Sequence, residues 1–100
     1  MATSKEYLDY ILEHLRRLDK VTYKPMMGEY LLYYDGTLFG GIYDNRFLVK
    51  KTDSNKKYNL QESIPYEGAK AMYLVDFSNQ KLQKDIIIDT YTDLRRKYER

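Results

Sequence analysis

Hydrophobic positions near the amino terminus recur at the spacing of one helix face, with charged residues on the opposite side. The apolar positions are Leu8, Ile11, Leu12, Leu15 and Leu18. This period predicts an amphipathic helix from about Ser4 to Leu18. Thr3 and Glu6 have the spacing of a capping box, so we expect Thr3 to cap the helix.

The middle of the chain has the pattern of an antiparallel hairpin. Two apolar runs, Glu29–Tyr34 and Thr37–Tyr43, flank the pair Asp35-Gly36. Asp-Gly between apolar runs favours a two-residue type I′ turn, and such a turn fixes the register of the two strands. The expected cross-strand pairs are Tyr34 with Thr37, Leu32 with Phe39, and Tyr30 with Gly41.

Two further strands are expected beside the hairpin. Val21–Met27 is rich in strand-forming residues, but Pro25 has no amide hydrogen to donate, which favours an edge strand or a strand with a break. On the other side, Asp44-Asn45 predicts a second turn, because asparagine tolerates positive φ, and Arg46–Lys51 follows as the next strand.

The expected register sorts the side chains onto two faces of the sheet, because successive residues of a strand point to opposite sides. The first face is mostly aliphatic and is expected to pack on helices; it holds Leu31, Tyr33, Leu38, Ile42, Phe47 and Val49. The second is aromatic with a basic margin; it holds Tyr30, Leu32, Tyr34, Phe39, Tyr43 and Leu48, with Arg46 and Lys50. A sheet with two apolar faces is either covered on both sides or uses one face for a partner.

The region between the hairpin and the last helix is less regular. Lys51–Leu60 is polar, and Thr52 can cap a short helix there. Ile64–Gly68 contains the proline and glycine of a loop, and Ala71–Val75 predicts a further strand.

The last helix is expected to begin with Ser78 as its N-cap, with Phe77 and Leu82 in the positions of a hydrophobic staple. Its apolar residues fall into two stripes that one straight face cannot hold: Leu82 and Ile86, then Ile87, Tyr91, Leu94 and Tyr98. We therefore expect either a kink or a second half that packs on another subunit. The candidate interaction surface combines this second stripe with the aromatic sheet face: Tyr30, Tyr34, Phe39, Tyr43, Ile87, Tyr91, Leu94 and Tyr98.

Composition narrows the class of protein. The 100 residues are 43% hydrophobic and 32% charged, which is typical of one globular domain spanning residues 1–100. The chain has no cysteine, which excludes disulfide and thiolate chemistry and fits a reducing compartment. No stretch approaches the ~20 apolar residues of a membrane helix. Charges interrupt any signal-peptide pattern, so the expected location is the cytoplasm.

The net charge of +2 is too small to argue for nucleic-acid binding by itself. Basic residues form loose clusters, but acidic residues are interspersed among them, as on a solvated surface.

No motif in the chain predicts catalysis, a cofactor or a metal ion. His14 is the only histidine and no cysteine accompanies it, so we expect a solvated or core-edge histidine and no transition-metal site. No serine sits in a nucleophile-elbow pattern, and no glycine belongs to a phosphate-binding loop. A carboxylate pair that converges only in space is the alternative, because spacing along the chain does not show it.

The pair Gly40-Gly41 inside a predicted strand has two interpretations. In the one we favour, Gly41 makes room for the ring of Tyr30 across the strand and Gly40 lets a helix approach. In the other, the two glycines floor a pocket walled by Tyr30, Phe39 and Tyr43.

Four different short motifs lie between Tyr23 and Lys50: Met27-Gly28, Asp35-Gly36, Phe39-Gly40-Gly41-Ile42 and Asp44-Asn45. With the later run Pro65–Lys70, they resemble the amino-terminal domain of the TfoX/Sxy competence regulators, in its single-domain branch. The resemblance implies an α+β fold of order α-β-β-β-α-β-β-α, with an antiparallel sheet packed on helices in the two-layer, secretion-chaperone-like manner. Ile64–Tyr66 is the candidate for the short strand that this order requires.

The resemblance also implies a function without catalysis. Full-length competence regulators carry a second, carboxy-terminal domain and are thought to assist a cyclic-AMP receptor protein at promoters, whereas this chain stops before such a domain. We therefore expect a non-enzymatic interaction module, as a homodimer or as an accessory to another protein in transcription regulation. Direct binding of nucleic acid stays open, as does a small-ligand binder or cryptic enzyme that uses the aromatic sheet face.

Overall fold

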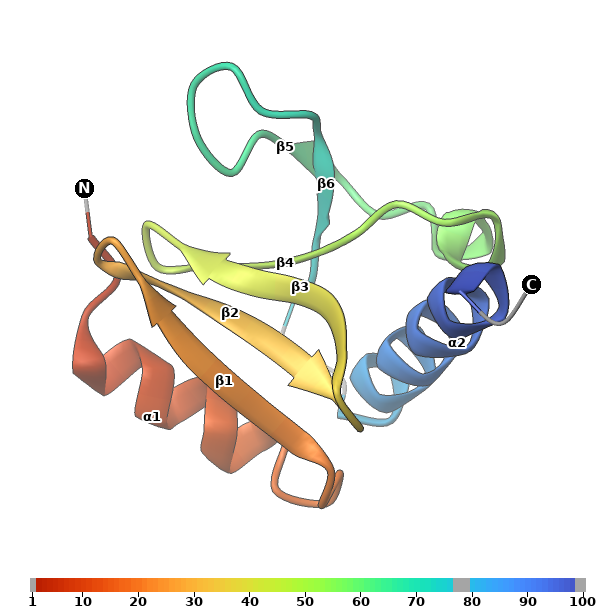
Figure 1. Cartoon of the computed structure of the whole chain (residues 1–100), viewed down its shortest axis with the longest axis horizontal. Coiled ribbons are helices and arrows are strands. Elements are labelled where there is room, and N and C mark those ends of the chain that lie inside the picture. The colour runs from red at the N-terminus through yellow and green to blue at the C-terminus, as the bar shows by residue number, and fades with distance from the viewer. Residues whose placement is uncertain (1, 77–79, 99–100) are drawn as a thin grey trace.

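An antiparallel sheet with two helices on one face forms the framework of the structure (Figure 1). The computed structural model describes residues 2–76 and 80–98. In this part of the chain the strands are β1 (Val21–Met26), β2 (Glu29–Tyr34), β3 (Thr37–Tyr43), β4 (Arg46–Val49), β5 (Glu62–Ser63) and β6 (Met72–Leu74), arranged β1-β2-β3-β4-β6-β5. The helices are α1 (Lys5–His14), α2 (Gln80–Tyr98) and the short 3₁₀ helix η1 (Asp53–Tyr58). The α+β class and the antiparallel sheet packed on helices are confirmed.

The order of elements differs from the expected one in two details. Four strands precede η1, because the segment after the Asp44-Asn45 turn pairs as β4. The short late strand is Glu62–Ser63 and not Ile64–Tyr66. β1 is the edge strand that Pro25 predicts, and it runs unbroken through that residue.

Helix α1 is capped by Ser4 and not by Thr3. The hydroxyl oxygen of Ser4 accepts a hydrogen bond of 3.1 Å from the amide of Tyr7. Thr3 is instead buried, and its amide and hydroxyl each donate to the carboxylate of Glu29 at 2.8 Å. The predicted capping box is therefore wrong by one residue, because a contact across the sheet edge engages the threonine.

A bulge in the central hairpin changes the predicted register. Asp35 and Gly36 both have positive φ, 48° and 82°, as the expected type I′ turn requires, and Tyr34 pairs with Thr37. Beyond that point the register shifts, so that Leu32 pairs with Gly40 and Phe39 is the extra residue of the bulge. The predicted pairs of Leu32 with Phe39 and of Tyr30 with Gly41 are wrong for this reason.

The bulge also recombines the two predicted faces. Because one strand gains a residue, side chains after the bulge exchange sides relative to those before it. The face packed on the helices holds Tyr30, Leu32, Tyr34, Phe39, Ile42, Phe47 and Val49. The opposite face, called here the open face, holds Leu31, Tyr33, Leu38, Tyr43, Leu48 and Lys50. Both faces thus mix aromatic and aliphatic residues, contrary to the expected separation.

One stripe of helix α2 faces the core. The buried positions are Gln83, Ile86, Ile87, Thr90 and Leu94, at the spacing of a single straight face. Leu82 is 38% exposed and lies outside this stripe. Ile86 of the first predicted stripe therefore shares one buried face with Ile87 and Leu94 of the second. This face also includes two polar residues, and it needs no kink and no second subunit to cover it. The predicted cap and staple at Ser78 and Phe77 lie outside the described residues.

The core joins both helices to one side of the sheet. Its members are Leu8, Ile11, Leu15, Leu18, Leu32, Phe39, Ile42, Phe47, Val49, Tyr73, Val75, Ile86, Ile87 and Leu94. Figure 1 shows α1 beneath β1 and β2, with α2 beside it near the other end of the sheet. The long segment between β5 and β6 projects away from both helices.

The close approach of β4 to β3 beside the bulge requires glycine at position 40, and this gives the first prediction. A Cβ there would overlap the carbonyl oxygen of Leu48 and lie 2.9 Å from the Cα of Val49, so alanine forces the strands β3 and β4 apart. We expect Gly40→Ala to lower the free energy of unfolding by at least ~2 kcal/mol, measured by urea denaturation. The control is Gly36→Ala. A Cβ at position 36 would have open space around it, so only the positive φ opposes the substitution, and we expect it to lower the free energy of unfolding by about 1 kcal/mol. Equal losses in the two variants would contradict the role of the close approach.

Candidate functional site

One cavity of the described structure opens on the open face of the sheet. It has a volume of about 550 Å³ and lies between the strands and the segment 65–72. Leu38, Gly40 and Met72 contribute its apolar floor, and Tyr43 and Tyr66 stand in its wall. This volume lies within the range of about 300–1,000 Å³ that is typical of ligand-binding pockets, so we treat it as the candidate site and call it the open-face pocket.

Arg46 holds in place the wall of this pocket that residues 65–72 form, called here the overhanging segment. Its guanidinium donates to the hydroxyl of Ser63, to the carbonyl oxygen of Ile64 at 3.0 Å and to that of Pro65 at 3.1 Å. Its Nε also donates to the carbonyl of Tyr43 at 3.1 Å. One side chain thus joins the end of β3 to the start of the overhanging segment, so the wall is held in place before any ligand arrives.

The two tyrosines of the wall are held against each other. The rings of Tyr43 and Tyr66 have centroids 6.2 Å apart, and Tyr43 is only 6% exposed whereas Tyr66 is 59% exposed. Burial, with a smaller contribution from Tyr66, raises the pKa of the Tyr43 phenol above its ordinary value. The Tyr43 hydroxyl therefore stays protonated at neutral pH.

Three lysines make the rim of the pocket basic. Lys50, Lys51 and Lys70 all line it, and they come from the end of β4 and from the overhanging segment. Lys51 is already paired with Glu62 at 2.8 Å, and this hydrogen bond raises the pKa of the lysine. Within the described residues neither Lys50 nor Lys70 has an ion pair. The rim therefore offers two uncompensated cations above an apolar floor.

The two glycines of β3 have different structural roles from those expected. Gly40 allows β4, not a helix, to approach, and its backbone lines the open-face pocket. Gly41 makes room for the ring of Tyr43, not of Tyr30, because a Cβ there would lie 2.7 Å from a ring carbon of Tyr43. The pocket interpretation is correct for Gly40 and Tyr43 but wrong for Tyr30 and Phe39, which belong to the core face.

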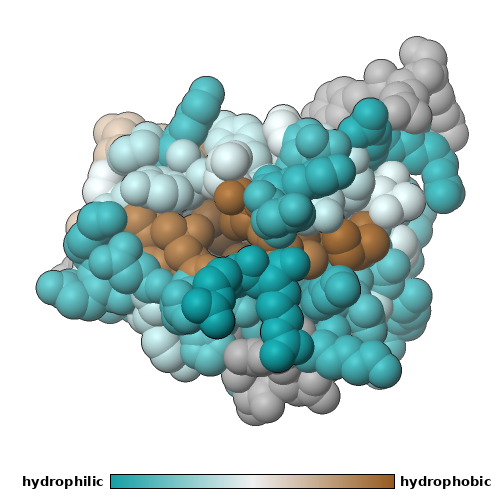
Figure 2. All heavy atoms as spheres, turned by 90° about the horizontal axis from the view of Figure 1, so that it is seen from below, coloured by the Kyte–Doolittle hydropathy of each residue, from teal (hydrophilic) through white to brown (hydrophobic). Residues whose placement is uncertain are grey.

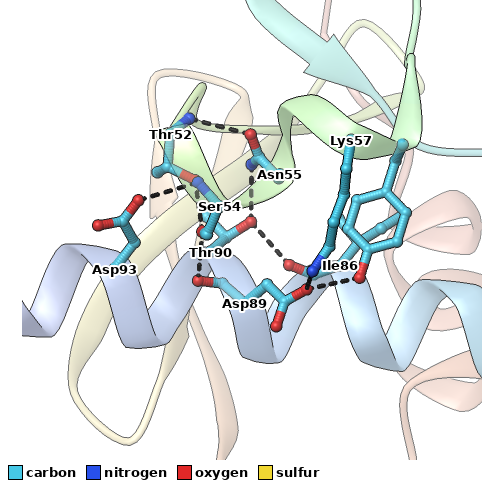
Figure 3. A network of polar contacts seen from close by, with 9 residues as sticks. Thr52, Ser54, Asn55, Lys57, Ile86, Asp89, Thr90 and Asp93 are labelled. Atoms are coloured by element: carbon cyan, nitrogen blue, oxygen red, sulfur yellow. Dashed lines mark hydrogen bonds and ion pairs between the residues drawn. The ribbon is translucent and has the colours of Figure 1, made fainter.

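A second polar cluster lies between η1 and α2 (Figure 3). Asn55 is fully buried and donates 2.8 Å hydrogen bonds to the Lys50 carbonyl and to the Thr90 hydroxyl, which in turn donates to the carbonyl of Ile86. Ser54 donates to the backbone carbonyl of Asp89 at 2.8 Å. These bonds satisfy the polar groups where η1 crosses α2, so the cluster fixes η1 on the helix.

Within the same cluster, Tyr58 and Asp89 perturb each other's protonation. The Tyr58 hydroxyl donates to the Asp89 carboxylate at 2.5 Å, and Lys57 pairs with the same oxygen at 3.1 Å. Burial and then this hydrogen bond raise the pKa of Tyr58 to about 12. The hydrogen bond from Tyr58, with that from Lys57, holds the pKa of Asp89 below its ordinary value.

The predicted interaction residues do not form one surface. Phe39, Ile87 and Leu94 lie in the core, and Tyr43 faces the opposite side of the sheet. Tyr30, Tyr34 and Tyr91 are half-buried. The ring of Tyr91 packs edge-on against Tyr34 with centroids 4.8 Å apart. The side chain of Tyr98 lies outside the described residues.

The residues that build the open-face pocket were largely missed by the sequence. Arg46, Lys50 and Tyr43 share the predicted aromatic face, but nothing in the periodicity joins them to Tyr66 or Lys70, some twenty residues away. In the sequence the run Pro65–Lys70 carries only a family motif. Its position opposite Gly40 depends on how β6 returns to β4, which the sequence pattern does not encode.

The remaining sequence expectations concern His14, a metal site and a membrane helix. His14 is half-buried, with its ring packed edge-on against Tyr10 at 4.4 Å between centroids. In residues 2–76 and 80–98, no three acidic or histidine side chains come together in a way that could hold a metal ion. Nor does any helix in those ranges have the length and apolar character to cross a membrane.

The fold and the site define a class of protein: a two-layer α+β domain with one helix-covered sheet face and one open face. A family model for the TfoX N-terminal domain matches residues 13–88. An uncharacterised 12.7 kDa protein encoded in the trpE 5′ region of Spirochaeta aurantia is 35% identical over 78 residues, covering 76% of this chain and 68% of the relative. The chain belongs to the TfoX N-terminal domain family.

The wall of the pocket gives the second prediction. Arg46→Met removes the hydrogen bonds to residues 63–65, so amide hydrogen exchange in the segment 65–71 should accelerate while exchange in α1 stays unchanged. The Ala69 amide, which donates to the Tyr66 carbonyl at 3.1 Å, is the most direct probe. Arg16→Met, at an exposed arginine paired with Glu13, is the control. Unaltered exchange at Ala69 in the Arg46 variant would refute the role assigned to this side chain.

The Tyr58–Asp89 pair gives the third prediction, a pH-dependent loss of stability. Because the folded pKa of Asp89 is depressed, its contribution is present above the ordinary value of 3.8 and is lost as the pH falls through the folded pKa. Because the folded pKa of Tyr58 is raised, its contribution is present below pH 10 and is lost as the pH rises through about 12.

We expect Tyr58→Phe to cost about 1 kcal/mol at neutral pH, with the difference from the wild type shrinking below pH 4. The measurement is urea unfolding across the acid range. Tyr10→Phe, at a tyrosine that is 48% exposed, is the matched control. A difference for Tyr58→Phe that does not change between neutral and acid pH would show that the pair does not carry this linkage.

Proposed function

We propose that this chain is a non-enzymatic interaction module that holds a segment of a partner protein in the open-face pocket. The observation that carries the proposal is a preformed cavity of about 550 Å³ on a sheet face that carries no helix in the described part of the chain. A half-exposed apolar floor of this kind is unusual unless something covers it.

The charges around the cavity indicate the chemistry of the occupant. Lys50 and Lys70 stand at the rim without a carboxylate partner among the described residues, and the floor beneath them is apolar. A peptide segment with one large apolar side chain next to aspartate or glutamate satisfies both features: the apolar group fills the cavity and the carboxylate pairs with the rim. Such pairing steers association and fixes register more than it adds affinity.

The pocket wall supports binding without a large ordering cost. Arg46 already holds the start of the overhanging segment through hydrogen bonds, and Tyr43 is already packed over Gly41. A preformed site loses less conformational entropy on binding than one that must be assembled by the ligand.

The family motivates the regulatory part of the proposal. Because the chain belongs to the TfoX N-terminal domain family, we infer that its partner is a cytoplasmic protein acting in transcription regulation, with this chain as an accessory. A second copy of the chain is the alternative occupant of the open face. Ile87 and Leu94 of the predicted α2 stripe are buried in the core, so we place a second copy on the open face and not on α2.

A small-molecule ligand is the second candidate function. The volume of the cavity and its paired aromatic rings suit a small amphipathic anion as well as a peptide side chain. This candidate differs from the first in needing no backbone contact outside the pocket.

The fourth prediction tests the peptide proposal. Selection of a phage-displayed library of random linear peptides against the immobilised chain should enrich sequences in which an acidic residue neighbours a large apolar one. Lys50→Glu/Lys70→Glu should reduce binding of the enriched peptides by at least ~tenfold, because attraction at the rim becomes repulsion. Fluorescence anisotropy with labelled synthetic peptides measures the loss.

The control Lys20→Glu/Lys56→Glu makes the same change of charge away from the pocket. Replacing the acidic residue of an enriched peptide by lysine should restore binding to the Lys50→Glu/Lys70→Glu variant. Equal binding of the enriched peptides to the Lys50→Glu/Lys70→Glu variant and to the control would refute the pocket as the binding site. Sedimentation velocity of the same variants tests the alternative that a second copy of the chain occupies the open face. A dimer that is present in the control but lost in the Lys50→Glu/Lys70→Glu variant would show that the second copy is the occupant.

A further inference from the structure

A second, smaller cavity lies where the end of α1 meets the beginning of α2. It has a volume of about 290 Å³. Leu15 and Leu18, 3% and 7% exposed, form its floor. His14, Arg17, Lys81 and Lys84 complete its lining. Among the described residues, every side chain that lines it is therefore either apolar or basic, and we call it the basic pocket.

The basic residues of this pocket come from segments far apart in the sequence. Arg17 follows α1, whereas Lys81 and Lys84 lie about one turn apart in the first half of α2. The sequence pattern gave no sign of this cluster, because its members fall in two stretches that also contain acidic residues. Figure 2, which views the molecule from the side of α1, shows hydrophilic residues bordering a band of hydrophobic ones.

The cations of the basic pocket are not balanced by carboxylates. In the described part of the chain no ion pair involves Arg17, Lys81 or Lys84, whereas the neighbouring Arg16 is paired with Glu13 at 3.4 Å. Glu13 does not line this cavity, although it shares an adjacent hollow with His14 and Arg17. Arg17, Lys81 and Lys84 thus line one small cavity that has an apolar floor.

The position of the lysines on α2 is also electrostatically unfavourable. The amino-terminal end of a helix carries a partial positive charge and normally has acidic residues near it. The first described turn of α2 has none and contains Lys81, and Lys84 follows at the start of the next turn. Two like charges one turn apart repel each other in addition. Within the described residues no ion pair compensates this arrangement, although Asp85 lies one turn after Lys81, and local departures from the usual preferences are of the kind found at binding sites.

We propose that the basic pocket binds a phosphate-bearing ligand through one terminal phosphoryl group. A dianion placed among Arg17, Lys81 and Lys84 removes their mutual repulsion and the unfavourable helix-end charge at once. Arginine and lysine together supply the planar fork and the mobile ammonium that suit phosphate oxygens. The small volume favours a single phosphoryl group over a large planar ligand.

The fifth prediction tests this site with inorganic phosphate and pyrophosphate as probes. In ¹H–¹⁵N correlation spectra, both anions should shift the amides of residues 14–18 and 80–85. The variant Lys81→Gln/Lys84→Gln should weaken binding by at least ~tenfold, because two charge-assisted hydrogen bonds are lost. The control Lys56→Gln/Lys97→Gln removes the same charge elsewhere and should bind as the wild type does.

Thermal unfolding gives a readout that separates the site from general salt effects. At equal ionic strength, phosphate should raise the Tm of the wild type above its value in chloride by more than it does in the Lys81→Gln/Lys84→Gln variant. In chloride at low salt that variant should itself be at least as stable as the wild type, because repulsion is relieved. Equal stabilisation of both proteins by phosphate would be the ordinary effect of an excluded anion and would overturn the proposal.

A short duplex DNA distinguishes a terminal phosphoryl group from a phosphodiester backbone. DNA binding that disappears in the Lys81→Gln/Lys84→Gln variant, together with no response to phosphate or pyrophosphate, would overturn the phosphoryl proposal in favour of backbone contact. Binding of phosphate and pyrophosphate with no effect of these substitutions on DNA mobility supports it.

Discussion

The close approach of β3 and β4 at Gly40 is the constraint on which the rest of the structure depends. A side chain at this position would collide with the backbone of β4, so only glycine lets β4 pair this closely beside the bulge. The bulge inserts Phe39 into the core face and turns Tyr43 to the opposite side. Without the extra residue, the two halves of the hairpin would present the wrong sets of side chains to the helices.

The same bulge creates the two different faces of the domain. On one side, α1 and α2 cover a continuous core that includes Phe39 and Phe47. On the other, Tyr43 folds over Gly41 and meets Tyr66 from the segment before β6, which leaves a cavity between them. A single irregularity in one strand thus accounts for both a well-packed core and an accessible apolar site.

The polar residues fall into two groups, one that maintains the fold and one that we propose to bind partners. The cluster of Asn55, Thr90 and Asp89 is saturated by contacts inside the chain, and it holds η1 on α2. The lysines of the open-face pocket and of the basic pocket have few such contacts among the described residues. This difference between satisfied and unsatisfied charge is what separates residues that maintain the fold from those we propose to bind partners.

The sequence by itself determined the local elements. The period of the apolar residues located α1, although the helix ends at His14 and not at Leu18, and the Asp35-Gly36 pair located the turn and the strands around it, because these depend on neighbours along the chain. The family could also be identified from short motifs in the same region. Thr52 at the start of η1 is a similar case, since its amide is satisfied by Asn55 three residues on.

Only the tertiary structure decided how these elements meet. The exchange of faces after Phe39, the single stripe of α2 with Gln83 and Thr90 inside it, and the use of Ser4 as the helix cap all follow from contacts between distant segments. Both candidate sites have the same origin, because Tyr43 with Tyr66, and Arg17 with Lys84, come together through the return of the chain and not through any spacing in it. Hydrophobic periodicity assigns a residue to one face of its own helix or strand, but it does not determine which other segment of the chain packs against that face.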